Sequence, residues 1–234
     1  MKQTKIIFVT GDKGGVGKTT TSRLLTSYLM EKNVPLMLFD TDKTNATFKR
    51  FFGEKVNLLD LSKKGSLDNL INDACSVDSG TNIVIDCAAR SLDVILDWMD
   101  EIGFEQIVDD YHLEVVFMFV LGGDKDSLQI LADLHEDVSS FKMKAQFVVV
   151  KNMGRSSDFS QFENSKTYKK LSDNGSFVLE IPSLLERTVL LLDKANLSFL
   201  SIKDSDLTVV DKQRALSFYR KCSDSFEGTS LWNT

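Results

Sequence analysis

Short, continuously apolar runs alternate along this chain with longer stretches in which apolar residues recur at helical spacing. The apolar runs are typical of strands buried on both faces, and they predict strands at 5–9, 35–39, 82–85, 113–121, 145–150 and 177–181. The stretches between them predict helices at 18–32, 66–75, 91–110 with a break at Gly103, 124–138, 159–172, 184–195 and 207–223. This alternation indicates an α/β fold, a mostly parallel, twisted sheet with helices on both faces.

The length of 234 residues suits one α/β domain with a full-sized core. We expect a single domain over 1–225 and a flexible tail at 226–234, because that end is mostly polar with one tryptophan. The sequence has no apolar run of about eighteen residues and no signal peptide before its first strand. Its three cysteines are far apart, which fits a reducing compartment. We therefore expect a cytoplasmic protein.

The net charge of −6 and the pI near 5.0 change the picture in one respect. A dedicated nucleic-acid-binding protein usually carries a basic balance, and this chain does not. A local basic patch remains compatible with an acidic total.

A glycine-rich segment follows the first predicted strand directly. Residues 11–20 read Gly-Asp-Lys-Gly-Gly-Val-Gly-Lys-Thr-Thr. Backbone N–H groups of such a turn can face an anion, and the helix that follows adds the positive end of its dipole. Lys18 supplies a mobile cation for the β- and γ-phosphates, and the Thr19 hydroxyl can hold Mg²⁺. The segment predicts a binding site for a nucleoside triphosphate.

Carboxylates follow two further predicted strands. Asp40 and Asp42 come at the end of the second strand, and Asp86 ends the third. Ligands of such sheets bind outside the carboxyl ends of the strands, so these side chains are expected beside the loop. Asp86 can bind the water shell of Mg²⁺. Asp40 and Asp42 can hold Mg²⁺ through water or orient an attacking water, or they can simply cap the next helix.

The loop resembles the deviant Walker A motif of the ParA/MinD family of dimerising ATPases. Eight consecutive residues, from Lys13 to Thr20, carry the resemblance, and Asp12 stands where the usual motif has glycine. In that family the additional lysine, here Lys13, reaches across a dimer interface to the nucleotide of the partner subunit. The resemblance implies these nucleotide-binding residues in the loop: Asp12, Lys13, Gly14, Gly15, Val16, Gly17, Lys18, Thr19 and Thr20.

Later segments extend the resemblance over about residues 4–200. Asp42 matches the family's water-positioning aspartate, but Lys43 replaces the proline that usually follows it. The strand that ends at Asp86 resembles Walker B, without the family's two prolines after it. Asn152 resembles an asparagine that reads adenine, and Pro182 a proline that flanks the base. The resemblance thus implies Lys13, Lys18 and Asp42 as catalytic residues, and Thr19, Asp42 and Asp86 as metal ligands.

The resemblance implies ATP and Mg²⁺ as cofactors, slow hydrolysis of ATP to ADP and phosphate, and a homodimer that forms on ATP binding. It also implies a small activating partner protein and a role in positioning or segregating DNA such as a plasmid. Nonspecific DNA contacts would come from clustered cations, which could equally be solvated helix faces. The candidates are Lys142, Lys144, Lys151, Arg155, Lys166, Lys169, Lys170, Lys203, Lys212, Arg214, Arg220 and Lys221.

Two other functions remain open. An accessory ATPase that positions a protein complex, for conjugation, secretion or a chemoreceptor cluster, would fit the acidic charge. An ATP-dependent biosynthetic enzyme of the dethiobiotin synthetase type has a loop similar to 10–12, but Lys13 argues against it. Membrane binding is not expected, because the C-terminal end is acidic and short rather than a basic amphipathic helix.

Overall fold

The computed structural model describes residues 2–11, 13–63 and 65–232. Seven strands form one sheet in the order β3-β2-β4-β1-β5-β6-β7, and every neighbouring pair is parallel. The strands are β1 (Lys5–Thr10), β2 (Leu36–Asp40), β3 (Val56–Leu58), β4 (Asn82–Asp86), β5 (Glu114–Leu121), β6 (Ala145–Asn152) and β7 (Phe177–Ile181).

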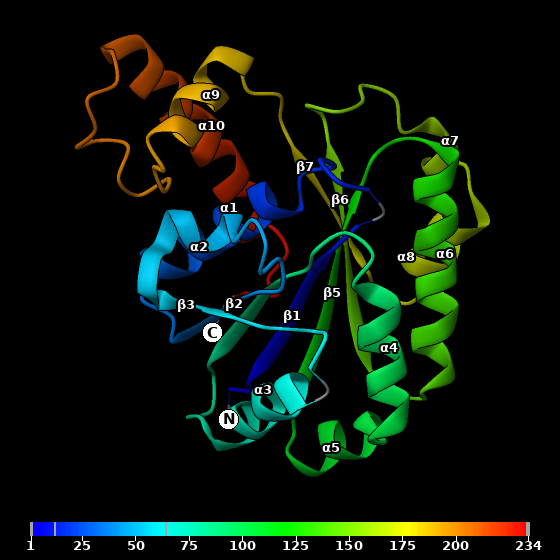
Figure 1. Cartoon of the computed structure of the whole chain (residues 1–234). Coiled ribbons are helices and arrows are strands. Elements are labelled where there is room, and N and C mark those ends of the chain that lie inside the picture. Colours follow the sequence, from blue (N-terminus) through cyan, green and yellow to red (C-terminus); the bar gives the residue numbers. More distant parts are fainter. Residues whose placement is uncertain (1, 12, 64, 233–234) are drawn as a thin grey trace.

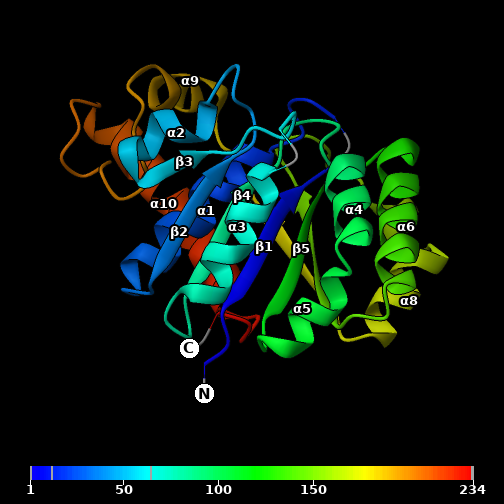
Figure 2. The ribbon, with the colours of Figure 1, turned by 60° about the horizontal axis from the view of Figure 1, so that its bottom comes forward.

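Helices cover both faces of this sheet (Figures 1 and 2). They are α1 (Lys18–Glu31), α2 (Thr47–Phe52), α3 (Gly65–Ser76), α4 (Leu92–Glu101), α5 (Phe104–Asp110), α6 (Lys125–Ser140), α7 (Ser160–Glu163), α8 (Lys166–Asp173), α9 (Glu186–Lys194) and α10 (Val209–Glu227). Along β1, Ile6 and Phe8 pack into one apolar cluster with α3 to α8, whereas Ile7 and Val9 pack into a second with α1, α2, α9 and α10. The alternation follows because successive side chains of a strand point to opposite faces.

The predicted fold class is confirmed, and each predicted strand is present. The helical stretch 91–110 is interrupted at Gly103, as predicted, where φ is +61°. The stretch 159–172 is two helices rather than one, because the Ser165 hydroxyl accepts a hydrogen bond from the Tyr168 N–H and starts α8. Sequence analysis missed α2 and the three-residue strand β3, which are too short for a periodic pattern.

The C-terminal segment, expected to form a flexible tail at 226–234, packs against the domain as far as its described residues reach. Helix α10 continues to Glu227, and the side chains of Phe226 and Trp232 are only 1% and 3% exposed. Phe226 packs on Tyr28 of α1 with 5.5 Å between ring centroids, and the Tyr28 hydroxyl donates to Glu227 at 2.9 Å. The mostly polar composition of this segment gave no sign that these two aromatic side chains are buried.

Within residues 2–11, 13–63 and 65–232, no helix is long and apolar enough to cross a bilayer.

Candidate nucleotide-binding site

The glycine-rich loop connects β1 to α1 at the carboxyl edge of the sheet (Figure 1). Gly14 and Gly15 are exposed, which leaves their backbone open to a ligand. Lys18 begins α1, is buried, and donates from Nζ to the backbone oxygen of Lys13 at 2.9 Å. The ammonium group therefore lies across its own loop, where an anion would be held. Thr20 is half-buried in the first turn of α1, and Asp12 lies outside the described residues.

Asn152, at the end of β6, holds the loop from the side. Its Nδ2 donates to the backbone oxygen of Val16 at 2.7 Å, and its Oδ1 accepts from the Gly154 N–H at 3.0 Å. Gly17 passes so close that a Cβ there would lie 2.4 Å from Nδ2, and its φ of +116° favours glycine. The expected adenine contact of Asn152 stays a prediction, since both polar atoms of its side chain have protein partners here. Pro182 directly follows β7 at the same edge of the sheet.

Asp86 ends β4, the neighbour of β1, and its carboxylate faces the start of α1. It accepts hydrogen bonds from the hydroxyls of Thr19, at 2.7 Å, and Ser22, at 2.8 Å. Burial raises the pKa of Asp86 to about 7, although these two hydrogen bonds and the charge of Lys18 act in the opposite direction. A carboxylate and a threonine hydroxyl at the end of a phosphate loop form an oxygen donor set that suits Mg²⁺.

The described residues contain no group of three His, Cys, Asp or Glu side chains that could hold a metal ion by themselves. Mg²⁺ usually keeps several waters and is held by one or two protein oxygens together with substrate phosphates. Thr19 and Asp86 are the residues whose positions match this need.

The two aspartates at the end of β2, Asp40 and Asp42, have separate roles in the structure. Asp40 is fully buried, and its Oδ2 accepts from the backbone N–H groups of Phe48 and Lys49, at 3.0 and 3.2 Å, so Asp40 fixes the start of α2. Asp42 is half-buried, and its carboxylate accepts from the backbone N–H and the side-chain amide of Asn45. These hydrogen bonds, with a smaller contribution from the charge of Lys18, lower the pKa of Asp42. The Asp42 side chain is thus kept ionised at the edge that carries the loop.

Thr41, between these aspartates, joins two loops, and sequence analysis missed it. Its Oγ1 accepts from the Ala88 N–H at 2.7 Å and donates to the backbone oxygen of Asp86 at 3.2 Å. Ala88 stands where the ParA/MinD family, which the sequence resembles, usually has proline, and proline would lack that N–H. The departure from the family pattern therefore supplies the donor that ties the loop after β2 to the loop after β4. A threonine between two aspartates was the only signal in the sequence.

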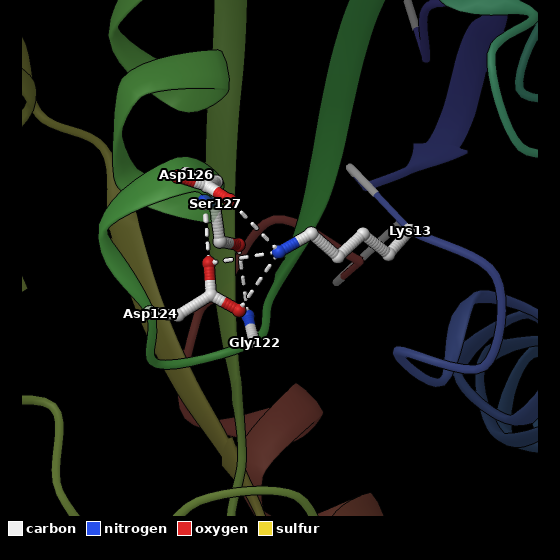
Figure 3. Close-up of polar contacts among 5 residues, drawn as sticks. All are labelled: Lys13, Gly122, Asp124, Asp126 and Ser127. Carbon is white, nitrogen blue, oxygen red and sulfur yellow. Dashed lines mark hydrogen bonds and ion pairs between the residues drawn. The ribbon is translucent and has the colours of Figure 1, made fainter.

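Lys13 points away from its own loop toward the start of α6 (Figure 3). Its Nζ lies 3.3 Å from Oδ2 of Asp124 and 3.2 Å from Oδ2 of Asp126. Hydrogen bonds to Asp126 and Asp124 raise the pKa of Lys13, whose side chain is 52% exposed. Asp124 also caps α6, because its Oδ1 accepts from the Ser127 N–H at 2.9 Å. The two lysines of the loop thus have different surroundings: Lys18 contacts its own loop, and Lys13 contacts the start of α6 on the surface.

A family model described as an AAA domain matches residues 4–114, which include the loop, Asp42 and Asp86. Protein TraL of Escherichia coli is 25% identical over 232 residues, which cover 90% of this chain and 92% of TraL. Among solved structures, the septum site-determining protein MinD of Pyrococcus horikoshii OT3, complexed with Mg-ADP, has a TM-score of 0.55 at 16% identity, covering 97% of this chain and 98% of MinD.

A second structure, described as a plasmid partition protein of Borrelia burgdorferi B31 bound to AMPPNP, has a TM-score of 0.54 at 16% identity. The similarity covers 94% of this chain and 99% of that protein. The all-parallel sheet with helices on both faces is therefore a P-loop NTPase-like fold, shared with MinD and with this partition protein. This similarity in fold agrees with the resemblance to the ParA/MinD family that residues 13–20 predict.

Proposed function

We propose that this protein is a Mg²⁺-dependent ATPase that acts as a dimerising switch: ATP favours the dimer, and slow hydrolysis releases it. The observation that carries the proposal is that the side chains of the two loop lysines, Lys13 and Lys18, extend in different directions. Lys18 lies on its own loop, 2.9 Å from a backbone oxygen, whereas Lys13 extends to the surface. One cation is placed for the subunit's own phosphates, and the other can reach a nucleotide presented by a second copy. Removal of the γ-phosphate removes the contact that favours the dimer.

Each residue at the site has a role in this proposal. Backbone N–H groups of 14–17 cradle the phosphates, and Lys18 leaves the Lys13 oxygen for them. Thr19 and Asp86 hold Mg²⁺, which neutralises charge on the phosphates when it is bound. Asp42 orients the attacking water, which its ionised state allows. The cofactors ATP and Mg²⁺ are supported by the nucleotide complexes of the two related structures.

The switch is tested by measuring mass in solution by light scattering with a slowly hydrolysed ATP analogue and, separately, with ADP. The wild-type mass should double with the ATP analogue only. Lys13→Ala should bind nucleotide but stay monomeric, and Lys18→Ala should lose nucleotide affinity, because the direct contact between cation and phosphate is gone. Dimerisation of Lys13→Ala at the wild-type level would refute the role of that lysine across the interface.

Hydrolysis is tested separately with Asp42→Ala. This variant should bind ATP with nearly wild-type affinity but hydrolyse it at a small fraction of the wild-type rate, because the carboxylate orients water rather than anchoring the nucleotide. It should accumulate as the ATP-bound dimer. Asp86→Ala should differ by losing Mg²⁺-dependent nucleotide binding as well. Loss of nucleotide binding by a folded Asp42→Ala protein would instead assign Asp42 to the metal site.

We infer further that the switch positions or segregates DNA such as a plasmid, with a small partner protein that stimulates hydrolysis. Support comes from the likeness to the plasmid partition protein. Two exposed cations on α10, Arg220 and Lys221, are suitable DNA contacts. The ATP-bound dimer should bind duplex DNA without sequence preference, with a log–log salt slope of about −0.9 per phosphate neutralised. Reversing both charges should weaken binding evenly across sequences and leave basal hydrolysis unchanged.

A specific observation favours a second function, the positioning of a protein complex. Several cations that were candidates for DNA contact have acidic partners instead. Lys151 pairs with Glu163 and Glu180 at 2.8 and 2.6 Å. Lys170 and Arg214 pair with Glu136 and Asp211. Together with the net charge of −6, this reduces the basic surface available to DNA. A dimer that binds no duplex DNA at low salt would support a protein cargo over DNA.

A further inference from the structure

A third cation, Arg155, lies over the glycine-rich loop. A Cβ at Gly15 would be 3.7 Å from Nη2 of Arg155, although the two residues belong to the loops after β1 and β6. Gly15 has a φ of +81° and is exposed. The guanidinium of Arg155 therefore lies near backbone that no side chain covers. Arg155 itself is exposed and forms no ion pair with any described residue. An arginine beside an anion-binding loop, with no carboxylate to neutralise it, is suited to an anionic ligand.

The backbone position of Arg155 depends on Asn152, the same residue that contacts the glycine-rich loop. The backbone N–H of Arg155 donates to the backbone oxygen of Asn152 at 2.9 Å, while the Asn152 side chain donates to Val16. The turn also packs tightly on the loop after β5, since a Cβ at Gly123 would lie 2.6 Å from the Cβ of Ser156. Contacts among the loops after β1, β5 and β6 therefore fix the backbone position of Arg155. From that position its side chain reaches the phosphate loop.

We propose that Arg155 binds the polyphosphate of the nucleotide held by its own subunit, as a cation additional to Lys18. This assignment rests on the proposed nucleotide site but not on dimerisation. The backbone N–H groups in the middle of such a loop contact the α- and β-phosphates, and Gly15 lies in that part of the loop. Because ADP and ATP share these phosphates, Arg155 contributes to the binding of both. The planar guanidinium can form two parallel hydrogen bonds to one phosphate, which an ammonium group cannot.

The test measures affinity for Mg-ADP by calorimetric titration of the full chain, and then affinity for a slowly hydrolysed ATP analogue. ADP is the main probe because it does not require the dimer. Arg155→Ala should bind ADP and the ATP analogue about ten- to hundredfold more weakly, as expected for loss of a charged hydrogen-bond pair. Arg155→Lys should recover part of this loss, because it keeps the charge but not the fork.

Lys194→Ala is the control, since it removes an exposed cation at the end of α9 that has no role in the proposed nucleotide or DNA contacts. It should bind ADP as the wild type does. The melting temperature without nucleotide should be the same for Arg155→Ala and the wild type, while the rise that ADP causes should shrink. This combination separates a ligand contact from a general loss of structure.

Each outcome bears on a different proposal. Wild-type ADP affinity in Arg155→Ala would overturn the assignment of Arg155 and leave the dimerising switch untouched. A loss confined to the ATP analogue would also overturn it, because that result places the arginine at the dimer interface. A loss for both nucleotides in a protein that never dimerises would support Arg155 and refute the switch. A wild-type protein that binds neither nucleotide would refute both.

Discussion

Replacing Gly17 with alanine tests how the phosphate loop is held. The backbone at Gly17 has a φ of +116°, and a Cβ there would lie 2.4 Å from Nδ2 of Asn152. A residue forced into such a conformation costs about 1–3 kcal/mol. The new methyl group also displaces the Asn152 amide from the Val16 oxygen, and a buried polar group without its partner costs about 1–3 kcal/mol. The sum is a loss of about 2–6 kcal/mol, against a total stability of about 5–15 kcal/mol for a domain.

The assay is equilibrium unfolding in urea without nucleotide, followed by the fluorescence of the buried Trp98 and Trp232. Gly14→Ala is the matched control in the same loop, because a Cβ at Gly14 would meet nothing within 4 Å. We expect that control to change the unfolding free energy by less than about 1 kcal/mol, including the reduced freedom of the unfolded chain.

The pair Gly17→Ala and Asn152→Ala separates the two contributions. If the collision with the amide matters, the double variant loses less stability than the sum of the single variants, because both remove the same hydrogen bond. The reasoning is refuted if Gly17→Ala unfolds at the same urea concentration and with the same slope as Gly14→Ala.

Three further predictions concern Thr41, the partners of Lys13 and the C-terminal segment. Thr41→Val should lower the unfolding free energy by about 1 kcal/mol, since it leaves the partly buried Ala88 N–H without its partner, and Thr41→Ser should restore most of it in the same urea assay. Asp126→Asn should strengthen ATP-dependent dimerisation severalfold in light scattering, because Lys13 is held less firmly, whereas Asp133→Asn on the same helix should not. Deleting residues 226–234 should abolish cooperative unfolding or cost at least about 3 kcal/mol, because it removes two buried aromatic rings.

The sequence was sufficient for the architecture because the pattern of this fold is local. Six strands appear as apolar runs buried on both faces, and helical periodicity separates them. The nucleotide-binding loop at 11–20 could also be predicted from the sequence, because such a loop depends on glycines and lysines close together between a strand and a helix. Where the pattern is short, prediction failed: β3 has three residues and α2 has six.

The tertiary structure decided what each polar side chain of the site touches, because those contacts join segments far apart in the chain. The sequence could not tell that Asp40 fixes α2, that Thr41 reaches Ala88, or that Arg155 lies over Gly15. Nor could it place Lys13 beside Asp124, 111 positions away. Apolar periodicity depends on residues that are close in the sequence, so it can be recognised from the sequence alone. The partner of a charge or of an N–H depends on which strands become neighbours, and only the folded sheet determines that.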